Sequence, residues 1–326
     1  MFGRVLAALA WFGQFSDPLA WLVVATFTAG AVLSWRDSRF AREVTVAAWV
    51  LFAVFWLSVL HHFAFVQKSF VEGIGTLVAV PASLYAGLLL ARGRDSLFVL
   101  SRAIAAMGII FFPFETITVL QEFLIETVTR QTAFLIELVG VDPTVVSGTQ
   151  VPSGTYPDYQ STFWFVEGEQ TITYTILIAC TGVGSMAIFG GLIAATEASL
   201  ARKFRALAVS IPVIYGLNLV RNVFIAVGFG TQRFHFFPDT VMSLFGSSDP
   251  YKVSYFIADR VLAQSLSVVA MVAITWVVVH ELPEVMVVIE DVLYMATGTE
   301  YDLQRALGVG MRETRSVSDG TSGRSP

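Results

Sequence analysis

The chain has 326 residues, of which 55% are hydrophobic and 14% charged, and its formal net charge is -5. Soluble domains carry about 25% charged residues, so this composition, with a mean hydropathy of +0.70, excludes an ordinary soluble protein. The sequence has no P-loop, no C-x-x-C motif and no basic stripe, which argues against nucleotide, haem and nucleic-acid binding.

Long apolar stretches, taken in chain order, predict seven transmembrane helices, because about 20 such residues cross the hydrocarbon core. The residues before the first stretch, Met1–Phe15, are expected to form a retained interfacial segment. The fold class is therefore an all-α polytopic membrane protein. The expected spans are Pro18–Ser34, Val44–Val66, Gly73–Ala91, Leu97–Leu120, Ala179–Thr196, Ala206–Phe229 and Val253–Val279.

The segment 121–174, between the fourth and fifth spans, is the longest extramembrane piece. Gln121–Val139 alternates apolar residues and glutamates at helical spacing, which predicts an amphipathic helix on the membrane. Val141–Gln160 is rich in Pro, Gly, Ser and Thr and is expected to be a loop. Thr162–Val166 and Gln170–Ile176 predict a β-hairpin, which delays the fifth helix to about residue 179.

Basic residues gather in alternate loops, and the positive-inside rule sets the orientation from them. It predicts an N-terminus and a segment 121–174 outside the cell membrane, and a C-terminus in the cytoplasm. We expect a transmembrane domain over residues 1–280 and a cytoplasmic tail over 281–326. The tail has an amphipathic stretch, Pro283–Ala296, and disorder is expected from Met311. The basic loop residues are Arg36, Arg39, Arg42, Arg92, Arg94, Arg202, Lys203 and Arg205.

Three reactive residues share one depth near the outer ends of the last three predicted spans: Cys180, Arg221 and Arg260. Each is expected within about 12 Å of the outer boundary. Cys180 is the only cysteine and is predicted in the first turn of the fifth helix, where the helix dipole favours a thiolate. Singly, a membrane cysteine is often a small apolar filler and such arginines often snorkel. Their common depth favours a thiol enzyme.

Several polar residues accompany this trio. The amides of Asn218, Asn222 and Gln264 lie within a turn of the arginines, where they are expected to orient the guanidinium groups or to satisfy an acyl oxygen. His61 and His62 are adjacent and point about 100° apart on a helix, so both cannot readily bind one metal ion. We therefore expect no metal and no cofactor. Glu115 is instead expected to pair with a histidine or an arginine.

Three short segments carry a family resemblance: residues 179–185 (Ala-Cys-Thr-Gly-Val-Gly-Ser), residues 218–222 (Asn-Leu-Val-Arg-Asn) and residues 258–260 (Ala-Asp-Arg). They resemble the exosortase/archaeosortase family of polytopic membrane transpeptidases. Many members of the wider family carry His at the third position, so Arg260 resembles the archaeosortase A branch. The match also marks Asp259, beside Arg260, as a supporting site residue.

This resemblance implies a substrate and a mechanism. Substrates of that branch are secreted proteins, typically surface-layer glycoproteins, with a C-terminal signal of a Pro-Gly-Phe motif, a transmembrane helix and a basic end. The signal is cut, and the mature protein is transferred to a membrane lipid. By resemblance, Cys180 forms a thioester with the substrate, and Arg221 and Arg260 stabilise thiolate or oxyanion charge. An arginine is a poor general base, so a pre-formed thiolate, water or another residue must handle the proton.

Two other functions stay open at this stage. Intramembrane arginines flanked by amides also suit a transporter of anions or lipids, which should work with Cys180→Ser. An intramembrane cysteine protease that hydrolyses without transfer differs from a sortase only in its product. The new C-terminus of a processed substrate, free carboxyl or lipid conjugate, separates these two enzymes.

Overall fold

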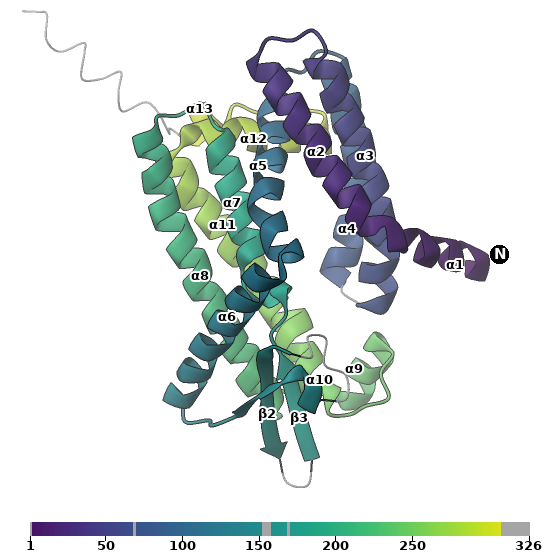
Figure 1. The fold of residues 1–326 in the computed structure, drawn as a ribbon, viewed down its shortest axis with the longest axis vertical. Coiled ribbons are helices and arrows are strands. Elements are labelled where there is room, and N and C mark those ends of the chain that lie inside the picture. The colour runs from purple at the N-terminus through teal and green to yellow at the C-terminus, as the bar shows by residue number, and fades with distance from the viewer. Residues whose placement is uncertain (1, 68–69, 152–157, 168–169, 308–326) are drawn as a thin grey trace, which may run out of the picture.

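The computed structural model describes residues 2–67, 70–151, 158–167 and 170–307. Its long helices run roughly along one axis, with a small β-sheet at one end and the C-terminal helices at the other (Figure 1). The helices are α1 Phe2–Phe12, α2 Ser16–Trp35, α3 Ala41–His61, α4 Phe70–Ala91, α5 Leu97–Thr116, α6 Thr118–Leu138, α7 Val183–Ala195, α8 Leu200–Gly230, α9 Pro238–Phe245, α10 Lys252–Tyr255, α11 Gln264–Glu281, α12 Met286–Thr297 and α13 Leu303–Leu307.

Within the described ranges, six helices are long and apolar enough to cross a membrane. They correspond to every predicted span except the fifth, so the predicted fold class is confirmed with a nearly matching span count. The first span also takes in part of the predicted interfacial start, because α1 leads into α2 through a short 3₁₀ turn. The six are Leu6–Trp35, Ala41–Val66, Glu72–Ala91, Leu97–Thr116, Leu200–Gly230 and Lys252–Glu281.

The fifth predicted span is the exception, because α7 has only 13 residues. At 1.5 Å per residue it extends about 20 Å, which is less than the hydrocarbon thickness of about 30 Å. α7 is packed inside the protein against α5. A Cβ atom at Gly191 would lie 2.6 Å from both the Ala103 oxygen and the Met107 nitrogen. Only glycine allows the two backbones this approach, as is common between membrane helices.

The extramembrane end holds a three-stranded antiparallel sheet in the order β1-β2-β3, with β1 Thr144–Ser147, β2 Gln160–Glu167 and β3 Gln170–Thr175. β2 and β3 confirm the predicted hairpin. β1 lies in the segment predicted as a loop, so that prediction is wrong there. The cause is the β-branched run of residues 144–146, which pairs with residues 162–164 of β2.

The sheet packs against the predicted amphipathic helix, now α6, and the C-terminal end of α8. One apolar core joins the three elements, and the approach is closest at Gly230, where a Cβ atom would lie 2.5 Å from Cγ of Phe165. This packing fixes β3 over the end of α8. The buried core residues are Ile125, Val128, Ile136, Tyr159, Phe163, Phe165, Ile172, Tyr174, Ile176, Ile225, Ala226, Val227 and Ala263.

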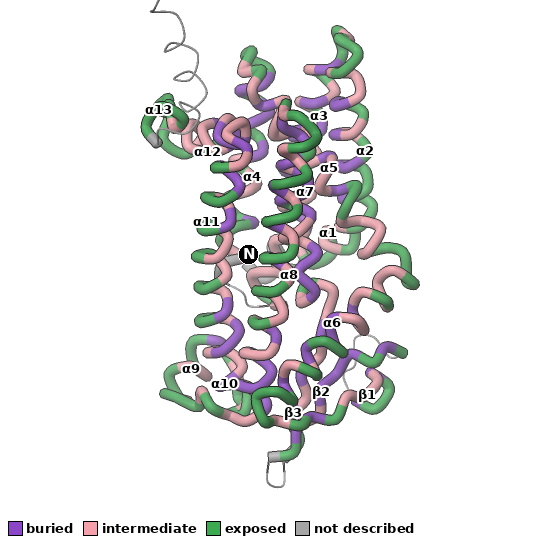
Figure 2. The backbone as a smooth tube through the Cα atoms, turned by 90° about the vertical axis from the view of Figure 1, so that its left-hand side faces the viewer, coloured by how far each residue is buried: buried purple, intermediate pink, exposed green. Residues whose placement is uncertain are grey.

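The described part of the C-terminal tail lies at the opposite end (Figure 1). The predicted amphipathic stretch is a 3₁₀ turn, Pro283–Val285, followed by α12. Its buried Val285 and Met286 share an apolar cluster with Ile193 of α7 and Val278 of α11. Figure 2 shows buried and exposed positions alternating along α11. The disorder predicted from Met311 lies outside the described residues.

Candidate active site

Cys180 ends a 3₁₀ turn, Ile178–Cys180, just ahead of α7. The prediction that it lies in the first turn of the fifth helix is therefore wrong. The reason is Gly182, whose φ of +79° is a left-handed conformation that redirects the chain into α7. Cys180 is partly exposed and still lies at the N-terminal end of that helix.

Two asparagines of α8 hold the Cys180 backbone. Nδ2 of Asn218 and Nδ2 of Asn222 donate to the Cys180 carbonyl oxygen at 2.7 and 2.8 Å. Residues four apart lie on one face of a helix, so both amides reach the same oxygen. Gly182 allows this approach, since a Cβ there would lie 3.0 Å from Cγ of Asn218. The amide nitrogens of both asparagines thus hold the cysteine backbone in place.

Asp259 orients the arginines. Nη2 of Arg221 donates to Oδ1 of Asp259 at 2.7 Å, and Nε of Arg260 lies 3.5 Å from Oδ2. The side chains are largely buried, with exposed fractions of 24% for Arg221, 12% for Arg260 and 9% for Asp259. Ion pairs in such surroundings are less screened than surface pairs. One carboxylate between two guanidinium groups leaves an excess positive charge at the site.

A π-helix, Phe256–Ala263, carries Asp259 and Arg260 and joins α10 to α11. π-helices are rare and frequently occur at functional sites. Their i to i+5 repeat aligns Tyr255 with Arg260, and Nη2 of Arg260 donates to the Tyr255 hydroxyl at 3.3 Å. The local winding therefore points a phenol and a guanidinium toward one another.

Tyr174 of β3 completes the cluster. It is inward-facing like Ile172 and Ile176, as alternate strand residues are. Burial, followed by the neighbouring Cys180, raises the pKa of Tyr174 well above its ordinary value, while Arg221 opposes this. The phenol therefore keeps its proton at neutral pH. Sequence reasoning missed Tyr174 and Tyr255, although strand alternation offered a signal for the first.

The structure brings Cys180, Arg221 and Arg260 together. Arg221 interacts electrostatically with Asp259, Tyr174, Cys180 and Tyr255, and Arg260 joins through Asp259 and Tyr255. Gln264 is partly buried at the start of α11, directly after the π-helix. The assembled groups are a thiol, two cations, a carboxylate and two phenols, most of them largely buried. Such a set can stabilise an anionic sulfur or oxygen.

The second cluster predicted from the sequence does not assemble. Glu115 is exposed near the end of α5, and no ion pair of its carboxylate occurs in the part of the chain that the structure describes, so the predicted pairing is wrong. His61 ends α3 and His62 begins the following π-helical turn. Among the described residues, no group of three or more His, Cys, Asp or Glu side chains is placed to hold a metal ion.

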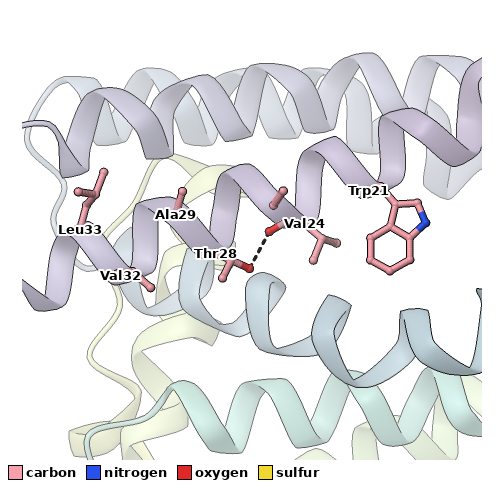
Figure 3. Close-up of a pocket in the computed structure, with 7 residues that line it drawn as sticks. Trp21, Val24, Thr28, Ala29, Val32 and Leu33 are labelled. Atoms are coloured by element: carbon pink, nitrogen blue, oxygen red, sulfur yellow. Dashed lines mark hydrogen bonds between the residues drawn. The ribbon is translucent and has the colours of Figure 1, made fainter.

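An apolar groove along α2 is a separate feature (Figure 3). Its one polar side chain, Thr28, donates its hydroxyl to the Val24 carbonyl at 2.7 Å. The groove therefore offers hydrocarbon contact but no reactive group, unlike the cluster around Cys180. Its lining residues are Trp21, Val24, Ala25, Thr28, Ala29, Val32 and Leu33.

Comparisons with known proteins identify the family of the chain. Residues 14–248 match the sequence profile of the family described as Transmembrane exosortase (Exosortase_EpsH). Archaeosortase A of Haloferax volcanii is 54% identical over 307 residues, covering 91% of this chain and 99% of the relative. Archaeosortase A of Natronomonas pharaonis is 44% identical over 282 residues, covering 86% and 88%. No solved structure gives a significant match.

Proposed function

Because this chain belongs to the transmembrane exosortase family, we propose that it is an archaeosortase-like membrane transpeptidase that uses Cys180 as its nucleophile. It is a multi-pass membrane protein, with six apolar helices of spanning length among the described residues. The observation that carries the proposal is that Asn218 and Asn222, on the same helix as Arg221, hold the backbone of the one thiol residue, Cys180. Asp259 joins Arg221 to Arg260 in the same cluster. A transporter has no need of a thiol held there by two backbone-directed amides.

The chemistry follows from the positions of these groups. The Cys180 sulfur attacks the carbonyl carbon of the scissile peptide bond, a C–S bond forms, and the C–N bond breaks. The thiol proton ends on the leaving amine. A nucleophilic headgroup of a membrane lipid then attacks the thioester, and its proton returns to the sulfur. Arg221 and Arg260 stabilise the oxyanion of both tetrahedral intermediates, an effect that is strong where water is excluded.

The substrates of the proposed enzyme are secreted proteins with a C-terminal Pro-Gly-Phe motif, a transmembrane helix and a basic end, such as a surface-layer glycoprotein. The proposed site faces the exterior of the cell membrane. Supporting this orientation, the basic loops lie at the end of the molecule that holds α12 and α13, away from the sheet (Figure 1). Ion pairs link them there: Arg42 to Asp95, Arg94 to Asp291 and Arg202 to Glu284.

Mass spectrometry of the substrate's new C-terminus tests the function. The wild type should yield a shortened protein linked to lipid, and Cys180→Ala should leave the signal intact. A shortened protein with a free carboxyl would identify a protease without transfer. Full activity of Cys180→Ala would overturn the thiol mechanism.

A further inference from the structure

Asn222 uses only half of its amide group. Nδ2 donates to the Cys180 carbonyl oxygen. A carbonyl oxygen only accepts hydrogen bonds, so chemistry fixes the amide nitrogen on that side and leaves Oδ1 facing elsewhere. Asn222 is fully buried, and Oδ1 has no hydrogen-bond partner among the described residues.

Arg260 has the complementary defect. Its Nε is buried and lies at ion-pair distance from Asp259, 3.5 Å, without forming a hydrogen bond. An unsatisfied buried polar atom destabilises a folded protein, and native proteins hold few of them. In the cluster that holds Cys180, one acceptor on Asn222 and one donor on Arg260 are therefore left without a hydrogen-bond partner.

An extended peptide supplies both missing partners, because each residue other than proline carries one N–H and one C=O. We propose that Asn222 Oδ1 accepts a backbone N–H of the substrate beside the scissile bond, while Arg260 Nε donates to a backbone C=O. Asn222 thereby ties the substrate to the nucleophile, since the opposite side of its amide holds Cys180. This inference rests on the proposed function and names the feature of the substrate that is recognised.

Both atoms are enclosed in this structure. Substrate reaches them by displacing side chains packed around Cys180, which is itself partly exposed. Pairing on binding then removes the penalty that the empty site carries. Hydrogen bonds to the substrate backbone do not depend on which side chains the substrate carries at these positions. Backbone recognition therefore adds to recognition of the Pro-Gly-Phe motif and does not replace it.

Asn218 provides the matched comparison. It donates to the same carbonyl, but it is only partly buried and its Oδ1 is not among the buried unpaired atoms. Binding is measured in the Cys180→Ala background, which keeps the backbone carbonyl and removes the chemistry. The probe is a synthetic peptide with the Pro-Gly-Phe motif and the following transmembrane segment, in nanodiscs. Asn222→Ala should raise Kd about tenfold and Asn218→Ala at most about twofold.

A depsipeptide scan identifies the N–H. Replacing one backbone N–H near the scissile bond by an ester oxygen should weaken binding to the protein that keeps Asn222 about tenfold. The same ester should weaken binding to Asn222→Ala little more than that substitution does alone, because the effects of two interacting groups are not additive. Equal Kd values for the two asparagine variants, or additive losses at every ester position, would overturn the proposal.

A second measurement covers the case in which Asn222→Ala does not accumulate. The ester scan is then run on the Cys180→Ala protein that keeps Asn222 and on Asn218→Ala in the same background. The same ester position should weaken binding about tenfold in both proteins, and the absence of any such position overturns the inference. Because none of these measurements needs cleavage, they stand apart from the proposed function, which fails if Cys180→Ala still processes substrate.

Discussion

The Cys180 backbone is held by two amides, and its side chain lies within the electrostatic reach of Arg221. Cys180→Ala should therefore abolish processing while the protein still accumulates in the membrane. Cys180→Ser should lose at least about 10³-fold, because a hydroxyl ionises far less readily and the site holds no evident base. The wild type should form a hydroxylamine-sensitive adduct with substrate that neither variant forms. Lipid-linked product from Cys180→Ala would contradict this role.

Arg221 acts through the geometry of its guanidinium group as well as its charge. Arg221→Lys keeps the charge but loses the planar fork that contacts Asp259. Processing should fall by about 10²–10³-fold, the usual cost of an oxyanion donor. Arg233→Lys is the matched control, since Arg233 is exposed on the turn after α8, and its processing rate should match the wild type. A normal rate for Arg221→Ala would show that this arginine serves only to anchor α8.

At the level of elements, the join between the 3₁₀ turn and α7 positions the nucleophile. Gly182→Ala puts a Cβ atom on a residue with φ of +79°, 3.0 Å from Asn218, and strain of about 1–2 kcal/mol follows. Asn218 must move, so we expect at least a tenfold loss of kcat with the protein still inserted. Gly184→Ala, two residues later, meets nothing within 4 Å and should process substrate normally. Equal processing rates for the two variants would show that Gly182 does not help to position Cys180.

The tail helix α12 is clamped to the α4–α5 loop by Arg94. Nε of Arg94 donates to the buried Asp291 at 2.6 Å, and its guanidinium stacks 3.9 Å from the Tyr294 ring. Arg94→Ala leaves that carboxylate buried without its cation, which costs about 3–5 kcal/mol and should lower Tm in detergent.

The exposed pair Arg42–Asp95 offers the control for this clamp, because surface pairs contribute about 0–1 kcal/mol. Arg42→Ala should leave Tm nearly unchanged, and a similar Tm for both variants would mean that α12 is not clamped by Arg94. Arg94 also lowers the pKa of Glu300. The contact between Arg94 and Glu300 stabilises the fold above the ordinary carboxyl pKa, and this stabilisation is lost as pH falls through the lowered pKa of Glu300. The Tm difference between wild type and Arg94→Ala should therefore narrow in acid.

For the whole molecule, the apolar lengths predicted the fold class because crossing a bilayer leaves few alternatives to long helices. They overestimated the length of the fifth helix, whose apolar run begins in the 3₁₀ turn before α7. Composition does not distinguish a helix surrounded by protein from a helix surrounded by lipid. α7 is packed against protein, with Gly191 in close contact with the backbone of α5.

The trio at the site was visible from the sequence because charge and thiol are rare in apolar segments. Their connections were not. Asp259 looked like a neighbour of Arg260, yet it also binds Arg221, 38 residues away. The target of the two asparagines depends on the turn at Gly182, and Tyr174 arrives from the sheet. Which side chains pair across different elements can be known only from the fold. Which reactive residues lie on one helix can be read from the sequence.

The orientation of the molecule can be tested with two positions at its opposite ends. Thr149 is exposed beside β1 and Thr299 is exposed after α12. In a Cys180→Ala background, each is replaced singly by cysteine and exposed to a membrane-impermeant maleimide on intact cells. The positive-inside rule predicts that α12 lies in the cytoplasm. Thr149→Cys should therefore be labelled at once and Thr299→Cys only after the cells are opened. The charge of the reagent prevents it from crossing the membrane. Prompt labelling of Thr299→Cys in sealed cells would therefore show that the tail lies outside. The cluster around Cys180 would then face the cytoplasm, where secreted substrates do not reach it.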